Sequence, residues 1–165
     1  PEELHHLKPV GRLDKDSTGL IILTNDGEFI NEMTHPSIKV PKVYLVHIDG
    51  RFTAENAEKM LNGIVIETDS GEKKTAYAET LPIEVNSKSS EIQVVLYQGI
   101  NRQIRKMFAK LGFEVKSLKR IQHATLTLEG LKRGQIKAIK PKQVKELKGY
   151  IAKIKREYAQ NSNNG

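Results

Sequence analysis

Hydrophobic residues alternate with polar ones in some segments and recur every three or four positions in others, which predicts both strands and helices. Strands are predicted at 10–14, 19–24, 42–48 and 91–97, as a pair within 64–85 around a turn at 69–71, and around 115–128 and 135–139. Helices are predicted at 28–34, 53–62, 101–111 and 141–158. Because strands outnumber helices and most neighbours are joined by short turns, the pattern predicts an α+β fold with a mixed, largely antiparallel sheet and flanking helices.

Three of these helices carry clear end signals. Thr53 is the expected N-cap of the helix at 53–62, and Gly63 is its expected stop. Asn101 is the expected cap of the helix at 101–111, whose hydrophobic residues recur at the spacing of one buried face. The last helix opens at Pro141, with an apolar seam and lysines on its outer side.

The chain has 165 residues, enough for one domain with its own core. We expect this domain to cover 1–160, where it could comprise two subdomains, and we expect the polar tail at 161–165 to be disordered. There is no cysteine, which excludes disulfides, Cys-ligated zinc and a cysteine nucleophile. No apolar run approaches the roughly 18–20 residues of a membrane span, and no signal peptide is visible, so a cytoplasmic location is expected. The first residue is Pro1 rather than Met, as in a fragment of a longer protein.

Charge is distributed unevenly along the sequence. Positions 1–100 hold 10 basic and 16 acidic residues, a net of −6, whereas positions 101–165 hold 17 basic and 4 acidic residues, a net of +13. Such a basic half favours a polyanionic partner, although a solvated lysine-rich surface explains the charge alone equally well.

Two segments place reactive or base-binding side chains in suggestive positions. Asp14 and Asp16 lie in a charged turn at 11–19, where a carboxylate can act as nucleophile or base, or with Mg²⁺ in phosphoryl transfer. The plainer alternative is that both are turn formers. Tyr44, in the middle of the strand at 42–48, is either a sheet-face tyrosine or a stacking platform for a base.

A third segment gathers cations at the start of a helix. Arg102, Arg105 and Lys106 surround the N-terminus of the helix at 101–111, and positions 101–120 contain seven basic residues and one acidic residue. A helix N-terminus with free N–H groups and cations favours phosphate. The five histidines do not cluster at metal-ligand spacing, so we expect no metal site and assign them, His123 included, structural or surface roles.

The three segments together resemble the signature of bacterial ribosomal RNA pseudouridine synthases of the RsuA-like branch. The resemblance rests on GRLD at 11–14, STGL at 17–20 and LTNDG at 23–27, then KVYLV at 42–46, then NRQIRKM at 101–107 with VKSLKR at 115–120. It spans roughly 8–145. It implies a central cleft in the α+β fold, isomerisation of a uridine in RNA to pseudouridine, and no cofactor or metal.

The resemblance also implies residue roles. Asp14 matches the family's catalytic aspartate, Tyr44 its active-site tyrosine, and Arg105 the basic partner of the aspartate. The polar and basic residues around them are expected to bind RNA: Arg12, Lys42, Asn101, Arg102, Gln103, Lys106, Lys119 and Arg120. The implied partner is ribosomal RNA, with large-subunit RNA slightly favoured, and the implied state is a monomer. The alternative is a non-catalytic RNA-binding or ribosome-assembly module of the same fold.

Overall fold

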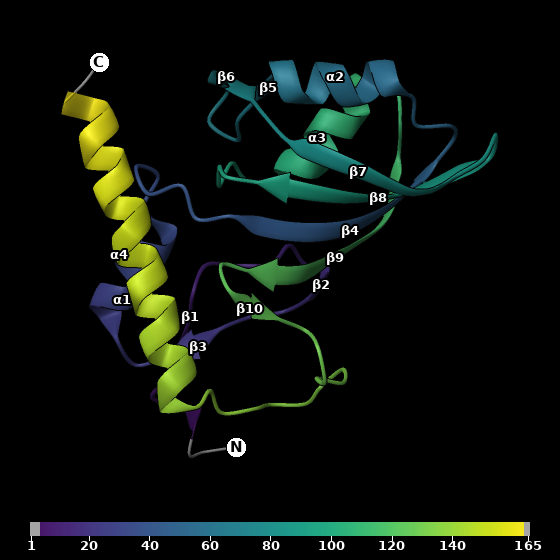
Figure 1. Ribbon diagram of the computed structural model, residues 1–165. Coiled ribbons are helices and arrows are strands. Elements are labelled where there is room, and N and C mark those ends of the chain that lie inside the picture. Colours follow the sequence, from purple (N-terminus) through teal and green to yellow (C-terminus); the bar gives the residue numbers. More distant parts are fainter. Residues whose placement is uncertain (1–3, 164–165) are drawn as a thin grey trace.

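A six-stranded sheet forms the centre of the computed structural model, which describes residues 4–163 (Figure 1). Its strands are β2 (Thr18–Gly19), β4 (Lys42–Asp49), β7 (Glu79–Val85), β8 (Ser89–Leu96), β9 (Val115–His123) and β10 (Leu126–Thr127). The order is β10-β9-β4-β8-β7, all antiparallel, and β2 adds a short parallel pair with β9. The predicted mixed, largely antiparallel sheet is therefore confirmed.

In the described part of the chain, two small antiparallel strand pairs and four helices surround this sheet. The pairs are β1 (Lys8–Pro9) with β3 (Leu23–Thr24), and β5 (Ile64–Glu67) with β6 (Lys73–Ala76). The helices are α1 (Gly27–Thr34), α2 (Ala54–Asn62), α3 (Gln103–Lys110) and α4 (Pro141–Asn163). Within the described residues, none of these helices is long and apolar enough to cross a membrane.

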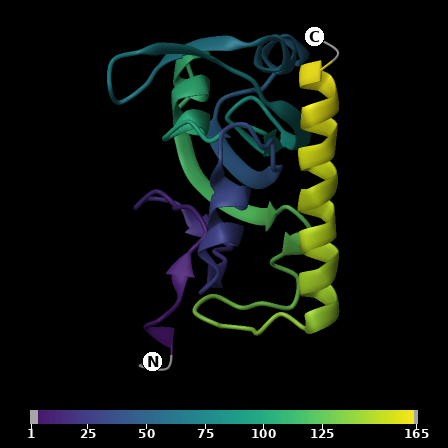
Figure 2. The same cartoon turned by 90° about the vertical axis from the view of Figure 1, so that its left-hand side faces the viewer.

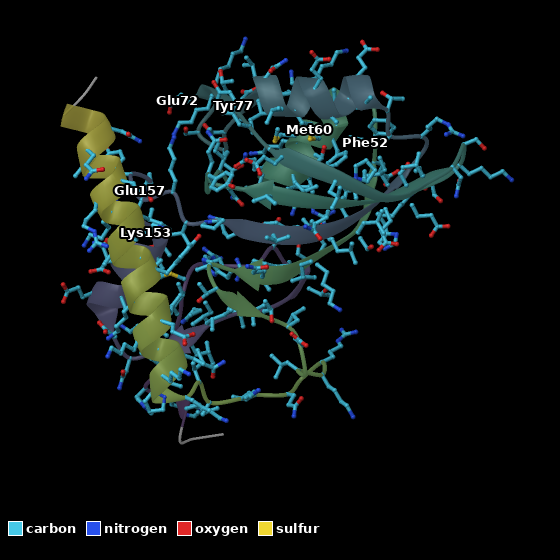
Figure 3. All side chains as sticks on the ribbon, in the orientation of Figure 1. Phe52, Met60, Glu72, Tyr77, Lys153 and Glu157 are labelled. Carbon is cyan, nitrogen blue, oxygen red and sulfur yellow. The ribbon has the colours of Figure 1, made fainter. Side chains whose placement is uncertain are left out.

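One hydrophobic core lies between the sheet and the helices α2 and α3. Phe52 and Met60 point into the space beneath α2 (Figure 3), and Met60 is fully buried. Phe108 of α3 is also fully buried, with its ring centroid 5.8 Å from that of Phe52. The predicted caps of α2 are confirmed, since the Thr53 side chain accepts from the Asn56 N–H and Gly63 ends the helix at φ +113°. Apolar spacing and capping chemistry thus act together here.

A second core lies where α4 and α1 meet the N-terminal segment. Leu147 and Ile151 of α4 pack in one buried cluster with Val10, Phe29 and Met33. Figures 1 and 2 show α4 running along one side of the molecule. Its lysine-rich outer side stays exposed, as the predicted seam requires. Residues 4–163 therefore form two buried clusters, with the cleft described below between the segments that carry them.

Several predicted elements differ from the observed ones. The predicted strand at 10–14 is wrong: β1 ends before it, because Gly11 takes φ +71° and turns the chain away after a single backbone bond from Val10 to Ile22. The apolar run at 19–24 is divided between β2 and β3, and 64–85 holds three strands rather than two.

The C-terminal part also departs from the prediction. The segment at 135–139 is not a strand: Gln135 closes a turn on Lys132, and within the described residues no strand pairs with this exposed stretch. Helix α4 extends through Asn163, beyond the predicted end at 158, because nothing at Tyr158 breaks the helix. Positions 164–165 lie outside the described residues.

Candidate functional site

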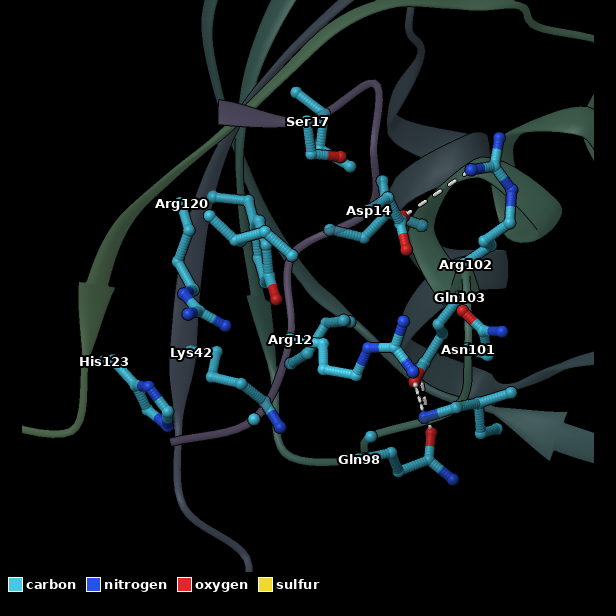
Figure 4. Close-up of a pocket in the computed structure, with 18 of the residues that line it drawn as sticks. Arg12, Asp14, Ser17, Lys42, Gln98, Asn101, Arg102, Gln103, Arg120 and His123 are labelled. Carbon is cyan, nitrogen blue, oxygen red and sulfur yellow. Dashed lines mark hydrogen bonds and ion pairs between the residues drawn. The ribbon is translucent and has the colours of Figure 1, made fainter. Parts of the chain in front are cut away.

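A cleft of about 490 Å³ opens between the loop at 11–17, the start of β4, the end of β8, the start of α3 and the end of β9 (Figure 4). Eight of the eleven residues expected to form the site line it: Arg12, Asp14, Lys42, Tyr44, Asn101, Arg102, Gln103 and Arg120. Three segments that lie far apart in sequence therefore meet at one cavity. Of the remaining three residues, Lys119 is exposed on β9, and Arg105 and Lys106 lie on α3 beside the cleft.

The loop that carries Asp14 is fastened to the N-terminus of α3 by charge. Both guanidinium nitrogens of Arg102 contact the Asp16 carboxylate, at 3.0 and 3.1 Å, and Arg102 Nη1 also lies 4.0 Å from Asp14 Oδ2. The paired guanidinium lowers the pKa of Asp16 below its usual value. Arg102 has φ +55°, a left-handed conformation that is costly for a side chain of this size, and the two-pronged contact offsets that cost.

The expected pair between Arg105 and Asp14 is not formed. Arg105 Nη2 donates instead to the Asp16 carbonyl oxygen at 3.0 Å, and Arg105 Nη1 lies 3.5 Å from the Asp16 carboxylate. Asp16 takes the contact expected of Asp14 because it lies two residues further along the same loop, beside the N-terminus of α3. Arg105 therefore positions the loop of Asp14, while Arg102 supplies the cation closest to the Asp14 carboxylate.

The predicted capping role of Asn101 is wrong. The residue in the cap position is Arg102, which makes no side-chain cap bond, and the Asn101 amide donates to Asp69 in the turn between β5 and β6. Lys106 Nζ lies 3.1 Å from the same Asp69 carboxylate. Lys106 and Asn101 together lower the pKa of Asp69. Asp69 therefore holds an acidic group over the cationic helix end, and the sequence gives no local signal for this contact across 37 positions.

Gln103 occupies the cleft as a buried structural amide. It is 2 % exposed, donates to the Tyr77 carbonyl oxygen at 3.2 Å and to Gln98 Oε1 at 3.0 Å, and accepts from the Ile100 N–H. These bonds satisfy its polar atoms and join the end of β8 to α3. Gln98, which is not among the predicted site residues, takes part in this connection between β8 and α3 by accepting from Gln103.

Tyr44 and Arg120 face each other across the pairing of β4 with β9, and Lys42 faces His123 in the same way. Burial raises the pKa of the Tyr44 phenol, so its hydroxyl stays protonated at neutral pH. Arg120 is 2 % exposed and is anchored by donation from its Nε to the Leu20 carbonyl oxygen at 2.9 Å. Tyr44 and Arg120 thus both line the cleft, and Figure 4 shows Arg120 on one side of it.

His123 lines the cleft, contrary to the structural or surface role expected from the sequence. In a regular strand, residues 120 and 123 face opposite sides. A register shift between Val43 and Tyr44 makes Ile121 an extra residue, and this bulge brings His123 to the side of Arg120. Nothing in the sequence marks the bulge, so the histidine could not be predicted to lie there.

The arrangement combines a carboxylate, a phenol and several cations in one cavity. Asp14 is 23 % exposed, open enough to meet a substrate and sheltered enough to act in a partly dry site. Across residues 4–163, no three His, Asp or Glu side chains are grouped to hold a metal ion. The Asp16 carboxylate, the second acid required for phosphoryl transfer with Mg²⁺, is already engaged by Arg102.

Comparison with known proteins gives consistent results. A family model described as RNA pseudouridylate synthase matches residues 1–110. The chain is 40% identical over 140 residues to ribosomal large subunit pseudouridine synthase B of Bacillus subtilis, covering 85% of this chain and 57% of the relative. It is 33% identical over 139 residues to ribosomal large subunit pseudouridine synthase E of Vibrio parahaemolyticus, covering 78% of this chain and 58% of that one. The chain thus spans somewhat more than half the length of these relatives.

Solved structures agree with this assignment of the fold. A crystal structure of a pseudouridylate synthase superposes with a TM-score of 0.77 at 27% sequence identity, covering 86% of this chain and 60% of that chain.

Proposed function

The chain belongs to the RNA pseudouridylate synthase family, and from this membership we propose that it converts a uridine of ribosomal RNA to pseudouridine in the cleft. The observation that carries the proposal is that Asp14 and Tyr44 line one cavity together with Arg102 and Arg120. Since the similar proteins from Bacillus and Vibrio are named for the large ribosomal subunit, we propose large-subunit RNA as the substrate. We further propose that 1–160 acts as one catalytic domain of a monomeric cytoplasmic enzyme.

Asp14 is the proposed catalytic carboxylate. A uridine within folded RNA is inaccessible, so the nucleotide must first be extruded into the cleft. The bond from ribose C1′ to N1 of uracil then breaks, the base turns, and C1′ bonds to C5. The hydrogen at C5 leaves as a proton and N1 gains one, so the reaction is an isomerisation. A carboxylate is a competent nucleophile or base toward the ribose.

Tyr44 and the cations around Asp14 have supporting roles in this proposal. Tyr44 is proposed to stack against the extruded base, and its hydroxyl, kept protonated by burial, is proposed to exchange a proton with that base. The Arg102 guanidinium lies 4.0 Å from the Asp14 carboxylate and attracts it electrostatically, and Arg105 holds the loop through Asp16. Arg12 lines the cavity beside Asp14 and is exposed, which suits a residue that fills the space left in the RNA.

The outer cations are proposed to contact the RNA backbone after giving up protein carboxylates. Arg102 and Lys106 are paired with Asp16 and Asp69, both more than half exposed, so an incoming phosphate can replace either carboxylate at modest cost. Lys119, exposed on β9, is proposed as a further backbone contact. These contacts with phosphate should make the affinity for RNA fall as the salt concentration rises.

The test is release of tritium from large-subunit RNA labelled at position five of uracil. Wild type should release tritium, and Asp14→Asn should release none while binding RNA with unchanged affinity. The matched control is Asp49→Asn, which changes an exposed carboxylate at the far end of β4 that is paired with Lys116. Equal release by wild type and Asp14→Asn would remove Asp14 from its role. Tight RNA binding without release by wild type would support the non-catalytic RNA-binding module instead.

A further inference from the structure

One wall of the cleft gathers two cations and a histidine, and three of their nitrogen atoms make no hydrogen bond among the described residues. Lys42 and His123 are directly opposed across the pairing of β4 with β9, and Arg120 follows on the same side, opposite Tyr44. Figure 4 shows Lys42, Arg120 and His123 together on one side of the cleft, with Asp14 and Arg102 on the other. We refer to Lys42, Arg120 and His123 as the cationic wall.

Part of the hydrogen-bonding capacity of the cationic wall is buried and unused. Arg120 Nη2 and both ring nitrogens of His123 are shielded from solvent and make no hydrogen bond in the structure. Both residues are only 2 % exposed. Within residues 4–163, no carboxylate lies within ion-pair distance of Lys42 or Arg120, whereas Arg102, Arg105 and Lys106 all have one. Buried donors without acceptors are rare in native proteins and call for a reason.

Burial and positive charge in the cationic wall lower the pKa values of two of its residues in the free protein. Burial, helped by the nearby Arg120 charge, lowers the pKa of the Lys42 ammonium to about 8. Burial, with Arg120 and Lys42 adding to it, lowers the pKa of His123 to about 3. An anion placed among these groups would raise both pKa values, because it favours each charged form.

We propose that Lys42, Arg120 and His123 form a subsite for one phosphate group of the RNA backbone next to the extruded uridine. The inference rests on the proposed function and specifies how the substrate is held. Arg120 is pre-aligned, because donation from its Nε to the Leu20 carbonyl oxygen fixes the guanidinium and leaves Nη2 for the ligand. Lys42 supplies a second charge and His123 a ring N–H donor. A phosphate with several acceptor oxygens satisfies all three groups.

A phosphate fits this wall better than the uracil base does. The carbonyl oxygens of uracil are neutral and would leave two adjacent positive charges uncompensated. In the proposed reaction the base stacks on Tyr44, which lies beside Arg120, while Asp14 approaches the ribose from across the cleft, so the charged groups of the wall are left for the phosphate. The wall then holds the backbone next to that sugar, which fixes the nucleotide by its charged end and leaves the base free to turn.

The test is titration of the protein with inorganic phosphate, followed by ¹⁵N signals of the histidine rings. Phosphate should shift the His123 ring nitrogens and leave those of the exposed His47 unchanged, an internal control on β4. Lys42→Met should weaken the phosphate affinity about tenfold or more, because a charge-assisted hydrogen bond is lost. Lys116→Met removes an equal charge from an exposed site on β9 and should leave the affinity unchanged.

The histidine is tested by a pair of variants. His123→Phe should lose phosphate binding, and His123→Gln, which keeps an N–H donor, should retain part of it. In RNA binding, Lys42→Met should reduce the slope of log affinity against log salt by about one phosphate contact, roughly 0.7–0.9. A thermal melt of each variant shows that it is folded.

Two results would overturn the subsite. In one, uridine without phosphate shifts His123 at concentrations where inorganic phosphate does not, which would make the wall a base or ribose site. In the other, neither ligand shifts His123, which would make it a closed structural cluster. The tritium assay is run on the same preparation, so release of tritium without a phosphate response refutes the subsite and leaves the proposed function standing.

Discussion

Gly19 is the point at which the loop of Asp14 meets the strand that carries Arg120, and it has no room for a side chain. A Cβ atom added there would lie 2.5 Å from the Arg120 nitrogen and closer still to the Arg120 carbonyl oxygen. Gly19 also has φ +120°, a conformation that residues with a Cβ rarely adopt. Replacing Gly19 by alanine should therefore break the parallel pairing of β2 with β9.

The magnitude follows from what the substitution disturbs. The atoms in the way belong to the backbone, so no side-chain rotation relieves the contact, and the backbone strain alone costs about 1–3 kcal/mol. The bond from the Leu20 N–H to the Arg120 carbonyl oxygen, 2.8 Å long, is lost as the strands separate and adds about 1 kcal/mol. We expect Gly19→Ala to lower the free energy of unfolding by about 3 kcal/mol.

Urea denaturation followed by circular dichroism measures this loss. The control is Gly149→Ala in the exposed interior of α4, where a Cβ meets nothing within 4 Å and alanine should raise stability by about 0.5–1 kcal/mol. Opposite signs for the two alanine variants would support the reasoning. A loss below about 1 kcal/mol for Gly19→Ala would refute it, because the two strands would then have room to separate without cost.

Three further changes test the core and the cationic wall. Phe108→Ala should cost about 3–5 kcal/mol in urea denaturation, because its buried ring packs against Phe52 and Phe113; a loss below about 1 kcal/mol would contradict this packing. Lys42→Met should raise the free energy of unfolding at pH 7 by about 2 kcal/mol. This gain should shrink between pH 8 and 10.5, because folded Lys42 is neutral there and the proton is removed from the unfolded wild type at a falling cost. No gain at pH 7 would show that Lys42 is well solvated. Wild type should lose stability by several kcal/mol as the pH falls from 6.5 toward 3, because only the unfolded chain protonates His123 in that range, and His123→Phe should lose less. Parallel pH profiles for wild type and His123→Phe would refute the last expectation.

The sequence predicts well wherever the information is local. The alternation at 42–48 marks β4, the cap at Thr53 and the stop at Gly63 bound α2, and the apolar spacing of α3 identifies its buried face. Each of these signals depends on residues that belong to one helix or one strand and lie close together in the sequence. The same holds for the fold class, because strand number and turn length are readable without knowing which strands pair.

The sequence predicts which residues form the site but not how they contact one another. Three motifs supply the residues of the cleft, but the contacts among them depend on positions far away. Asp16, a turn residue by its local sequence, is held by Arg102 across 86 positions and takes the place expected of Asp14 beside Arg105. His123 reaches the cleft only through a strand bulge, whose location depends on the register with β4. Pairing and register are properties of the packed molecule, so periodicity cannot reveal them.

The cations of the cleft fall into two sets that should contribute differently to RNA binding. Arg102 and Lys106 are already paired with exposed carboxylates, so a phosphate must displace Asp16 or Asp69 before it gains anything from them. Within the described part of the chain, Lys42 and Arg120 have no carboxylate to displace, and their burial is unfavourable in the free protein. A bound anion removes this unfavourable term, so its removal contributes to the free energy of binding. The paired outer set should therefore mainly govern the encounter rate, whereas the unpaired buried set should govern how long the extruded nucleotide stays.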